Sequence, residues 1–304
     1  MNPNVLFKKR KLWTIALYKL KNESEIFELD AFEPFHFLGE RGIRRNAEYQ
    51  STTADPFLFV HNLRLYIFFE IQTDFGIGEI WAHSMDAHGA WINHGQVLKE
   101  DFHLSYPQVF LHDGKVWMIP ETASSGKVWL YTADPCPNKW RKVRVLIDEP
   151  LLDPSIIFQP EGIFLLGTTL TDELKLYFSA DLEQEFVSSG FVISNDKAIS
   201  RNAGKPLHIH DVIYRVAQNC KYTYGQNISL LEIEQLSVDG YSERMMMADL
   251  YRRKPKWMEA GYHHISTAFF GNELFVAVDG MRKDKYVNTL LLAWFKIAEL
   301  RKNG

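Results

Sequence analysis

Two positions 11 residues apart recur five times along the chain. The first position opens an expected strand, and the second is an aromatic residue in the next strand. The pairs are Asp55/Tyr66, Tyr106/Trp117, Asp153/Phe164, Ala203/Tyr214 and His264/Phe275. Successive aromatic residues lie 51, 47, 50 and 61 positions apart, and a period near 50 in a chain of short strands is typical of β-propellers. We therefore predict an all-β fold, a five-bladed β-propeller.

The expected blades cover most of the chain. They span about residues 50–100, 101–150, 151–196, 197–250 and 257–297. Closed β architectures of this length often form one domain, so we predict a single domain over residues 1–304. The last blade has three expected strands, the third over 289–297, and would leave an open edge. We expect the apolar strand 12–17 to complete this blade and close the ring, with pairing to the first blade as the alternative.

The composition excludes several classes of protein. A net charge of −4 does not favour nucleic acid as a partner. No apolar run reaches the roughly 18 residues that a membrane span needs. The basic start of the chain lacks a cleavage site, so we expect a cytoplasmic protein without a transmembrane segment. Cys136 and Cys220 form neither a disulfide framework nor a metal-ligand spacing, so we expect free thiols.

Polar residues are concentrated at one end of the innermost strands. In antiparallel neighbours the start of each first strand and the end of each second strand meet on the same side. The starts are Asp55, Tyr106, Asp153, Ala203 and His264, and the ends are Glu70, Glu121, Thr168, Gln218 and Asp279. Nine of these ten positions are polar in otherwise apolar strands. The pattern predicts a binding site at one axial mouth, although polar strand ends that merely meet water are the plainer alternative.

Further candidates for ligand binding lie beside these positions in the sequence. They are His103, Arg201, Arg215, Asn219, Tyr224 and His263. A lone histidine is more often a structural hydrogen-bonding group, and Arg215 has an alternative role as an ion-pair partner of Glu121 or Asp279. Clustered carboxylates repel one another, so at least one should have a raised pKa or a neighbouring cation.

The starts of blades one and three resemble the five-bladed propeller glycoside hydrolases of the arabinanase and xylosidase type. That resemblance implies an aspartate base at Asp55 and a second aspartate at Asp153. The general acid of that family is a glutamate near the start of blade four, where this chain has no carboxylate over 200–204. Hydrolysis by two carboxylates requires an acid and a base. By analogy with the same family, we also expect a central cation near His264. The spacing of residues in this sequence does not by itself indicate one.

A closer resemblance covers about residues 50–250. It rests on motifs that include Ala54-Asp55-Pro56-Phe57-Leu58, Phe102-His103-Leu104-Ser105-Tyr106-Pro107, Ile119-Pro120-Glu121-Thr122 and Tyr214-Arg215-Val216-Ala217-Gln218-Asn219-Cys220. These strings resemble the N-terminal domain of the glucosamine inositolphosphorylceramide transferase family. The resemblance implies a carbohydrate-related role and a glycosyltransferase or formyltransferase partner.

Three functions remain open from the sequence. In the first, the mouth binds an anionic sugar derivative such as a sugar phosphate during glycan or glycolipid assembly. Asp55 or Glu70 would then act as base, Asp153 and Glu121 would orient sugar hydroxyls, and Arg201 or Arg215 would hold the anionic group. The remaining binding candidates are His103, Tyr106, Gln218, Asn219, Tyr224, His263, His264 and Asp279. The second is a non-catalytic carbohydrate-binding or scaffold propeller, and the third is an atypical hydrolase with Glu121 as its acid.

Overall fold

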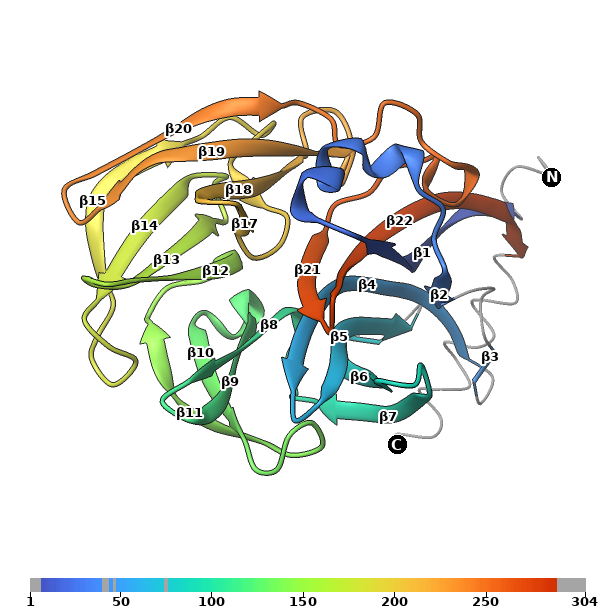
Figure 1. Cartoon of the computed structure of the whole chain (residues 1–304), viewed down its shortest axis with the longest axis horizontal. Coiled ribbons are helices and arrows are strands. Elements are labelled where there is room, and N and C mark those ends of the chain that lie inside the picture. Colours follow the sequence, from blue (N-terminus) through green and yellow to red (C-terminus); the bar gives the residue numbers. More distant parts are fainter. Residues whose placement is uncertain (1–6, 40–43, 46–47, 74–75, 289–304) are drawn as a thin grey trace.

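Five antiparallel sheets surround a common centre in the computed structural model, which describes residues 7–39, 44–45, 48–73 and 76–288 (Figure 1). Each sheet forms one blade, so the predicted five-bladed β-propeller is confirmed. The blades follow one another around the centre in chain order, apart from the segment that closes the ring. No helix in these described ranges is long and apolar enough to cross a membrane.

The first four blades are built from consecutive strands. Blade one contains β3 (Arg44–Arg45), β4 (Glu48–His61), β5 (Arg64–Thr73), β6 (Glu79–Asp86) and β7 (Trp91–Leu98). Blade two contains β8 (Ser105–His112), β9 (Lys115–Glu121), β10 (Val128–Ala133) and β11 (Trp140–Ile147). Blade three contains β12 (Leu151–Gln159), β13 (Gly162–Thr169), β14 (Leu174–Ser179) and β15 (Val187–Ser194). Blade four contains β16 (Arg201–Asn202), β17 (Leu207–Ile209), β18 (Val212–Asn219), β19 (Asn227–Ser237) and β20 (Gly240–Met247).

The last blade combines the two ends of the chain. Its strands run in the order β21 (Ile265–Phe270), β22 (Glu273–Asn288), β1 (Phe7–Leu20) and β2 (His36–Leu38). The predicted pairing of 12–17 with this blade is therefore confirmed. The strand expected over 289–297 lies outside the described residues. Between β1 and β2 runs the 3₁₀ segment η2 (Glu23–Ala31); η3 (Ala123–Ser125) and η4 (Lys256–Met258) are shorter.

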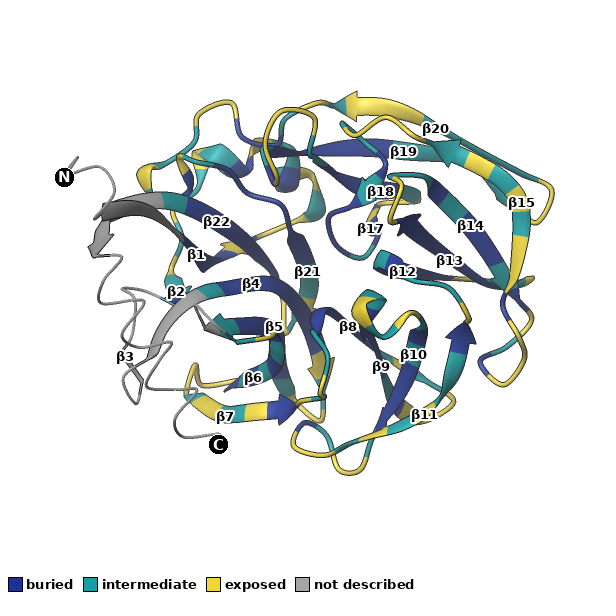
Figure 2. Ribbon diagram, turned by 180° about the vertical axis from the view of Figure 1, so that it is seen from behind, coloured by how far each residue is buried: buried dark blue, intermediate teal, exposed yellow. Residues whose placement is uncertain are grey.

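Burial decreases from the inner strands to the outer ones (Figure 2). The inner strands of blades one to three are almost wholly buried, whereas β15 and β20 alternate between exposed and partly buried positions. Apolar side chains of neighbouring blades share continuous clusters, for example Phe68 of blade one with Met118 and Tyr131 of blade two. Burial of each large apolar side chain contributes on the order of 1.5–3 kcal/mol, so packing between blades is the main stabilising contribution.

Candidate functional site

Three inner strands carry the same backbone irregularity at the start of the blade. In each case two residues of the first strand lie opposite a single residue of the second strand, which is a β-bulge. The bulged residues are Asp55-Pro56, Tyr106-Pro107 and Asp153-Pro154. Asp55, Tyr106 and Asp153 adopt left-handed backbone angles, with φ of 54°, 49° and 48°. Proline has no N–H to donate to the ladder, so a bulge at this position costs little pairing. Because left-handed φ is strained for these residue types, its threefold recurrence suggests a functional constraint.

These bulges turn backbone N–H groups toward acidic side chains of the adjacent blade. The Asp55 N–H donates to Asp279 Oδ2 at 3.2 Å, and the Tyr106 N–H donates to Asp55 Oδ2 at 3.2 Å. The Asp153 N–H donates to Glu121 Oε2 at 3.0 Å. Each carboxyl group is therefore fixed by the backbone of the next blade, and four blades are linked in a chain around the axis.

Five buried carboxyl groups gather at this end of the axis, and we call them the carboxylate cluster. The members are Asp55, Glu70, Glu121, Asp153 and Asp279, each no more than 8% exposed. All ten strand starts and strand ends that were expected at the axial mouth are buried in the structure. Such a group of acids cannot all be ionised unless cations or hydrogen-bond donors compensate them.

The neighbours of these acids separate their pKa values. Burial alone would raise the pKa of Asp55, but the adjacent His264 and His263, with Arg201, lower it to about 2. Burial, reinforced by Asp153 and only partly opposed by Arg201, raises the pKa of Glu121 to about 8. Burial and then the other four acids raise the pKa of Glu70 well above its usual range. Near neutral pH the cluster therefore combines ionised Asp55 with protonated Glu121, and the raised pKa of Glu70 favours its protonated form as well.

Arg201 is the arginine that reaches the cluster. Its Nε donates to Asp153 Oδ2 at 2.6 Å, and a terminal nitrogen lies 3.6 Å from Glu121 Oε2. Gln218 donates to the same Asp153 oxygen at 2.6 Å. The guanidinium carbon of Arg201 lies over the ring of Tyr224, 5.3 Å from the ring centre. Tyr224 itself is 43% exposed. The blade-four side of the site thus presents a cation and an aromatic face at the border with solvent.

His103 supports Glu70 on the opposite side of the site. The Gly78 N–H donates to His103 Nδ1 at 2.8 Å, which leaves Nε2 as the protonated nitrogen of a neutral ring. That Nε2 lies 3.4 Å from Glu70 Oε1. A side chain at position 78 would meet the Leu104 carbonyl at 2.4 Å and Glu70 Oε1 at 2.5 Å, so only glycine fits there. Gly78 was not among the residues predicted from the sequence.

Two adjacent histidines complete the axial end of the cluster. Asp279 Oδ1 accepts the backbone N–H groups of His263 and His264, both at 2.9 Å. His264 is fully buried against Phe57 and Tyr106, and neither of its ring nitrogens has a hydrogen-bond partner. His263 packs against Trp13, with ring centres 4.1 Å apart and the ring planes tilted by 32°.

The donor set at this point fits a bound cation. Asp55, His263 and Asp279 each offer a ligand atom, and these atoms lie within 4.8 Å of one another. His263 Nδ1 lies 2.6 Å from Asp279 Oδ2 without hydrogen-bond geometry. The neighbouring His264, whose Nδ1 lies 3.5 Å from Asp55 Oδ1, has no hydrogen bond at either ring nitrogen. Buried imidazole nitrogens without hydrogen bonds, beside two carboxylates, form a donor set that suits a divalent cation.

Two predicted ligand-binding residues lie less centrally. Arg215 is 1% exposed, and its guanidinium forms a paired contact with Glu243 at 2.6 and 2.7 Å instead of reaching Glu121 or Asp279. Its other terminal bonds go to the Ile199 carbonyl and Asn202. Asn219 uses its side-chain oxygen to accept the N–H of Lys221. The structure therefore assigns Arg215 a packing role within blade four, and Asn219 shapes the loop that carries Tyr224.

Some residues of the site carried no signal of their own in the sequence. Asn202 donates to the carbonyls of Asp153 and Leu166 and so fixes the bulge of blade three. The Gly204 N–H donates to the Tyr106 hydroxyl at 2.8 Å, and Ser155 hydrogen-bonds the same hydroxyl at 2.7 Å. Asn202 and Gly204 closely follow Arg201, and Ser155 closely follows Asp153, so proximity in the sequence to a predicted site residue was the one available clue.

The five-bladed β-propeller fold is shared with solved structures of other proteins. A β-xylosidase/α-arabinofuranosidase from a compost microbial metagenome, in complex with xylotriose, superposes with a TM-score of 0.56 at 12% identity, covering 81% of this chain and 94% of that one. An α-L-arabinofuranosidase from Clostridium thermocellum gives a TM-score of 0.53 at 13% identity, covering 73% and 80%. At this identity the likeness concerns the fold.

The sequence relationship is more specific. Residues 43–281 match the family model described as glucosamine inositolphosphorylceramide transferase 1, N-terminal, and the chain belongs to this family. The chain is 32% identical over 250 residues to glucosamine inositolphosphorylceramide transferase 1 of Oryza sativa subsp. indica, covering 75% of this chain. The Arabidopsis thaliana protein of the same name is 31% identical over 246 residues. The chain spans about a third of the length of these relatives (33% and 32%).

Proposed function

We propose that the carboxylate cluster binds a sugar derivative, and that the chain acts in glycan or glycolipid assembly. The observation that carries the proposal is the set of five buried acids beside partly exposed Arg201 and Tyr224. Carboxylates accept hydrogen bonds from sugar hydroxyls, and an aromatic face such as that of Tyr224 suits the apolar side of a sugar ring. Membership of a transferase family named for glucosamine supports the carbohydrate class.

The anionic group of the proposed ligand would meet Arg201. Among the described residues, the Nε of Arg201 contacts Asp153 and one terminal nitrogen faces Glu121. The second terminal nitrogen can therefore contact a phosphate or carboxylate of the ligand. Arg215 takes no part in this form of the proposal because Glu243 already occupies its guanidinium. A sugar phosphate fits both parts of the site. Its hydroxyl groups would contact the acids, and its phosphate would contact Arg201.

The different pKa values of the acids support the proposed acid and base roles. Asp55, with its pKa of about 2, is ionised and can accept the proton of an acceptor hydroxyl. Glu121, with its pKa of about 8, retains its proton near neutral pH and can donate a hydrogen bond or a proton, and the raised pKa of Glu70 favours the same role. This assignment also supports a second candidate, an atypical glycoside hydrolase with Glu121 as acid, because hydrolysis requires such a pair.

Two further proposals concern what accompanies the site. We propose that Asp55, His263 and Asp279 hold a divalent cation, which would stabilise negative charge on a bound ligand. In that state Asp55 would be a ligand, and it would not act as a free base. We also propose that the domain works beside a glycosyltransferase or formyltransferase partner, since the named relatives are about three times as long.

Calorimetric titration of glucose 1-phosphate, glucose and glucosamine tests the sugar site. Arg201→Ala should weaken glucose 1-phosphate binding by about 10-fold or more, since a charge-assisted hydrogen bond contributes about 1.5–3 kcal/mol. Glucose binding should change little. Lys221→Ala, which removes an exposed cation near Tyr224, is the matched control and should leave both affinities unchanged.

The alternatives give different results in the same series. Equal affinity of the native protein and Arg201→Ala for the phosphate would exclude the anion role. Absence of binding by all three sugars would exclude the sugar site and favour a scaffold. Turnover of an aryl xyloside or arabinoside that Glu121→Gln abolishes would establish the hydrolase.

A further inference from the structure

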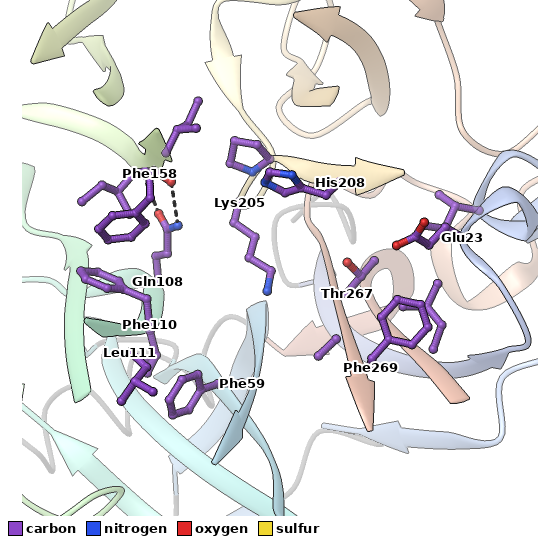
Figure 3. Close-up of a pocket in the computed structure, with 17 residues that line it drawn as sticks. Glu23, Phe59, Gln108, Phe110, Leu111, Phe158, Lys205, His208, Thr267 and Phe269 are labelled. Atoms are coloured by element: carbon purple, nitrogen blue, oxygen red, sulfur yellow. Dashed lines mark hydrogen bonds between the residues drawn. The ribbon is translucent and has the colours of Figure 1, made fainter. Parts of the chain in front are cut away.

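A second cavity lies at the opposite end of the axis (Figure 3). Its volume is about 550 Å³, within the range of pockets that hold small molecules. The walls come from the far ends of β4, β8, β12 and β21, from the loop after β16, and from Glu23 of η2. None of its lining residues belongs to the carboxylate cluster.

A plug of packed groups separates the two ends. Gly204 passes across the axis, where its N–H meets the Tyr106 hydroxyl and its carbonyl accepts a bond from Ser155 at 3.3 Å. The next residue in the loop, Lys205, extends from Gly204 into the second cavity. The cavity and the carboxylate cluster are therefore separated by packed groups and share no lining residue.

The walls of the second cavity are strongly aromatic. Phe59, Phe110, Phe158 and Phe269 all line it. Phe158 is 38% exposed and Phe269 is 50% exposed, so these rings are not used to fill a closed core. Large apolar rings open to solvent around a cavity are typical of binding sites for apolar ligand bodies.

One amino group points into this apolar space. Figure 3 shows the end of Lys205 between the Gln108 side and the Thr267 side of the cavity. Lys205 has no hydrogen bond or ion pair with any residue in the described ranges, and burial lowers its pKa to about 8. The cavity carboxylate Glu23 instead accepts the backbone N–H of His210 at 2.8 Å. A cation held among aromatic rings without a counter-ion is a site for an anion.

We propose that this second cavity binds a small organic anion with an aromatic or short acyl body, whose anionic group pairs with Lys205. The aromatic walls supply contact area for the body, and Lys205 supplies the single charge that selects an acid over its neutral analogue. The ligand chemistry differs from that at the acids, where hydroxyl groups are favoured.

Two fluorescent probes of nearly equal shape separate the two contributions. The sulfonate 1-anilinonaphthalene-8-sulfonate carries a permanent negative charge, and N-phenyl-1-naphthylamine is its neutral counterpart. Lys205→Met should weaken binding of the sulfonate at least tenfold and leave binding of the neutral probe unchanged. Lys205→Arg keeps the charge and should retain the sulfonate. Lys115→Met, which removes an exposed lysine at the start of β9, is the matched control.

The pH dependence of the native protein gives a test that needs no substitution. Sulfonate affinity should be constant below about pH 7 and then fall through pH 8 toward pH 9.5 as Lys205 loses its proton, while the neutral probe shows no such fall. Glu23 and His208 also face the cavity; burial lowers the pKa of His208, so its charge does not change in this range. A flat sulfonate profile, equal loss of both probes in Lys205→Met, or displacement of the sulfonate by glucose 1-phosphate would overturn the proposal.

Discussion

The acids of the carboxylate cluster differ in charge because each has different neighbours. Asp55 faces two histidines and stays ionised, whereas Glu121 faces Asp153 and stays protonated near neutral pH. Arg201 compensates Asp153 directly through its 2.6 Å contact. The site can therefore hold five acids in a small volume without five full charges.

Replacing Glu121 by glutamine should change how stability depends on pH. The folded-state pKa of about 8 exceeds the usual glutamate value, so its contribution is fully present at low pH and is lost as pH rises toward 8. Glu121→Gln cannot ionise, so relative to the native protein it should gain stability between pH 5.5 and 8.5, by at most about 1.4 kcal/mol per pH unit. Urea denaturation at both pH values measures the difference; a constant difference would show that Glu121 is ionised throughout.

The buried pair of Arg215 and Glu243 should be important for stability. Glu243→Ala leaves the Arg215 charge buried without its partner, which typically costs about 3–5 kcal/mol. Arg244→Ala removes an adjacent but exposed cation from Glu232 and Glu234 and should cost no more than about 1 kcal/mol. Chemical denaturation compares the two variants. Similar losses would mean that Arg215 is stabilised by other groups.

The sequence predicted which strand ends meet at one end of the axis. It did not predict for each of these residues whether its side chain points into the site. The period of about 50 residues places Glu70, Glu121 and Asp279 at equivalent strand ends, and all three are in the cluster. Arg215 and Gln218 are three residues apart on β18, so they point to opposite faces of the strand. Gln218 reaches Asp153, and Arg215 therefore faces Glu243. Gly78 and Asn202 act through backbone contacts that have no sequence motif.

Strand β1 is the element that closes the ring. It pairs with β22 along Phe7–Leu20 and with β2 on its other side, and Ile15 and Leu17 are fully buried. The sequence indicated the partner of this strand, because the last blade lacked one. Its position inside the blade was not predictable, because an open edge does not specify how many strands follow.

Removing residues 1–20 should therefore open the last blade. The deletion exposes the β22 edge and the apolar residues that β1 covers, so we expect loss of cooperative unfolding and self-association. A synthetic peptide of residues 7–20 added in trans should restore cooperative thermal unfolding. A peptide with Ile15 and Leu17 replaced by aspartate is the control. A deletion protein that melts like the native chain would show that β1 is dispensable.

In the molecule as a whole, the Gly204 plug divides the axis into an acidic end and an aromatic end. The φ of Gly204 is +136°, and an added Cβ would lie 2.0 Å from the Ile265 carbonyl oxygen. The plug links blade four to blades two, three and five through Tyr106, Ser155 and Ile265. The two ends therefore lie on opposite sides of this set of hydrogen-bonded groups.

Gly204→Ala should destabilise the whole propeller. Both the left-handed backbone and the contact with the Ile265 carbonyl oppose a side chain there, so the loss should exceed that of an ordinary left-handed glycine. Gly89→Ala is the control, since Gly89 has φ +83° but nothing within 4 Å, and it should cost about 1–2 kcal/mol. Urea denaturation measures both. A Gly204→Ala loss no larger than the control would show that the plug yields easily.

A crystal structure of the protein soaked with glucose 1-phosphate tests the sugar site most directly. We predict density for the sugar ring at the carboxylate cluster, with hydroxyls within hydrogen-bond distance of Asp55, Glu70 or Asp153 and the phosphate at Arg201. Density confined to the Lys205 cavity, or a phosphate bound away from Arg201 with no sugar contact to the acids, would contradict the assignment of this end of the propeller as the sugar-binding site.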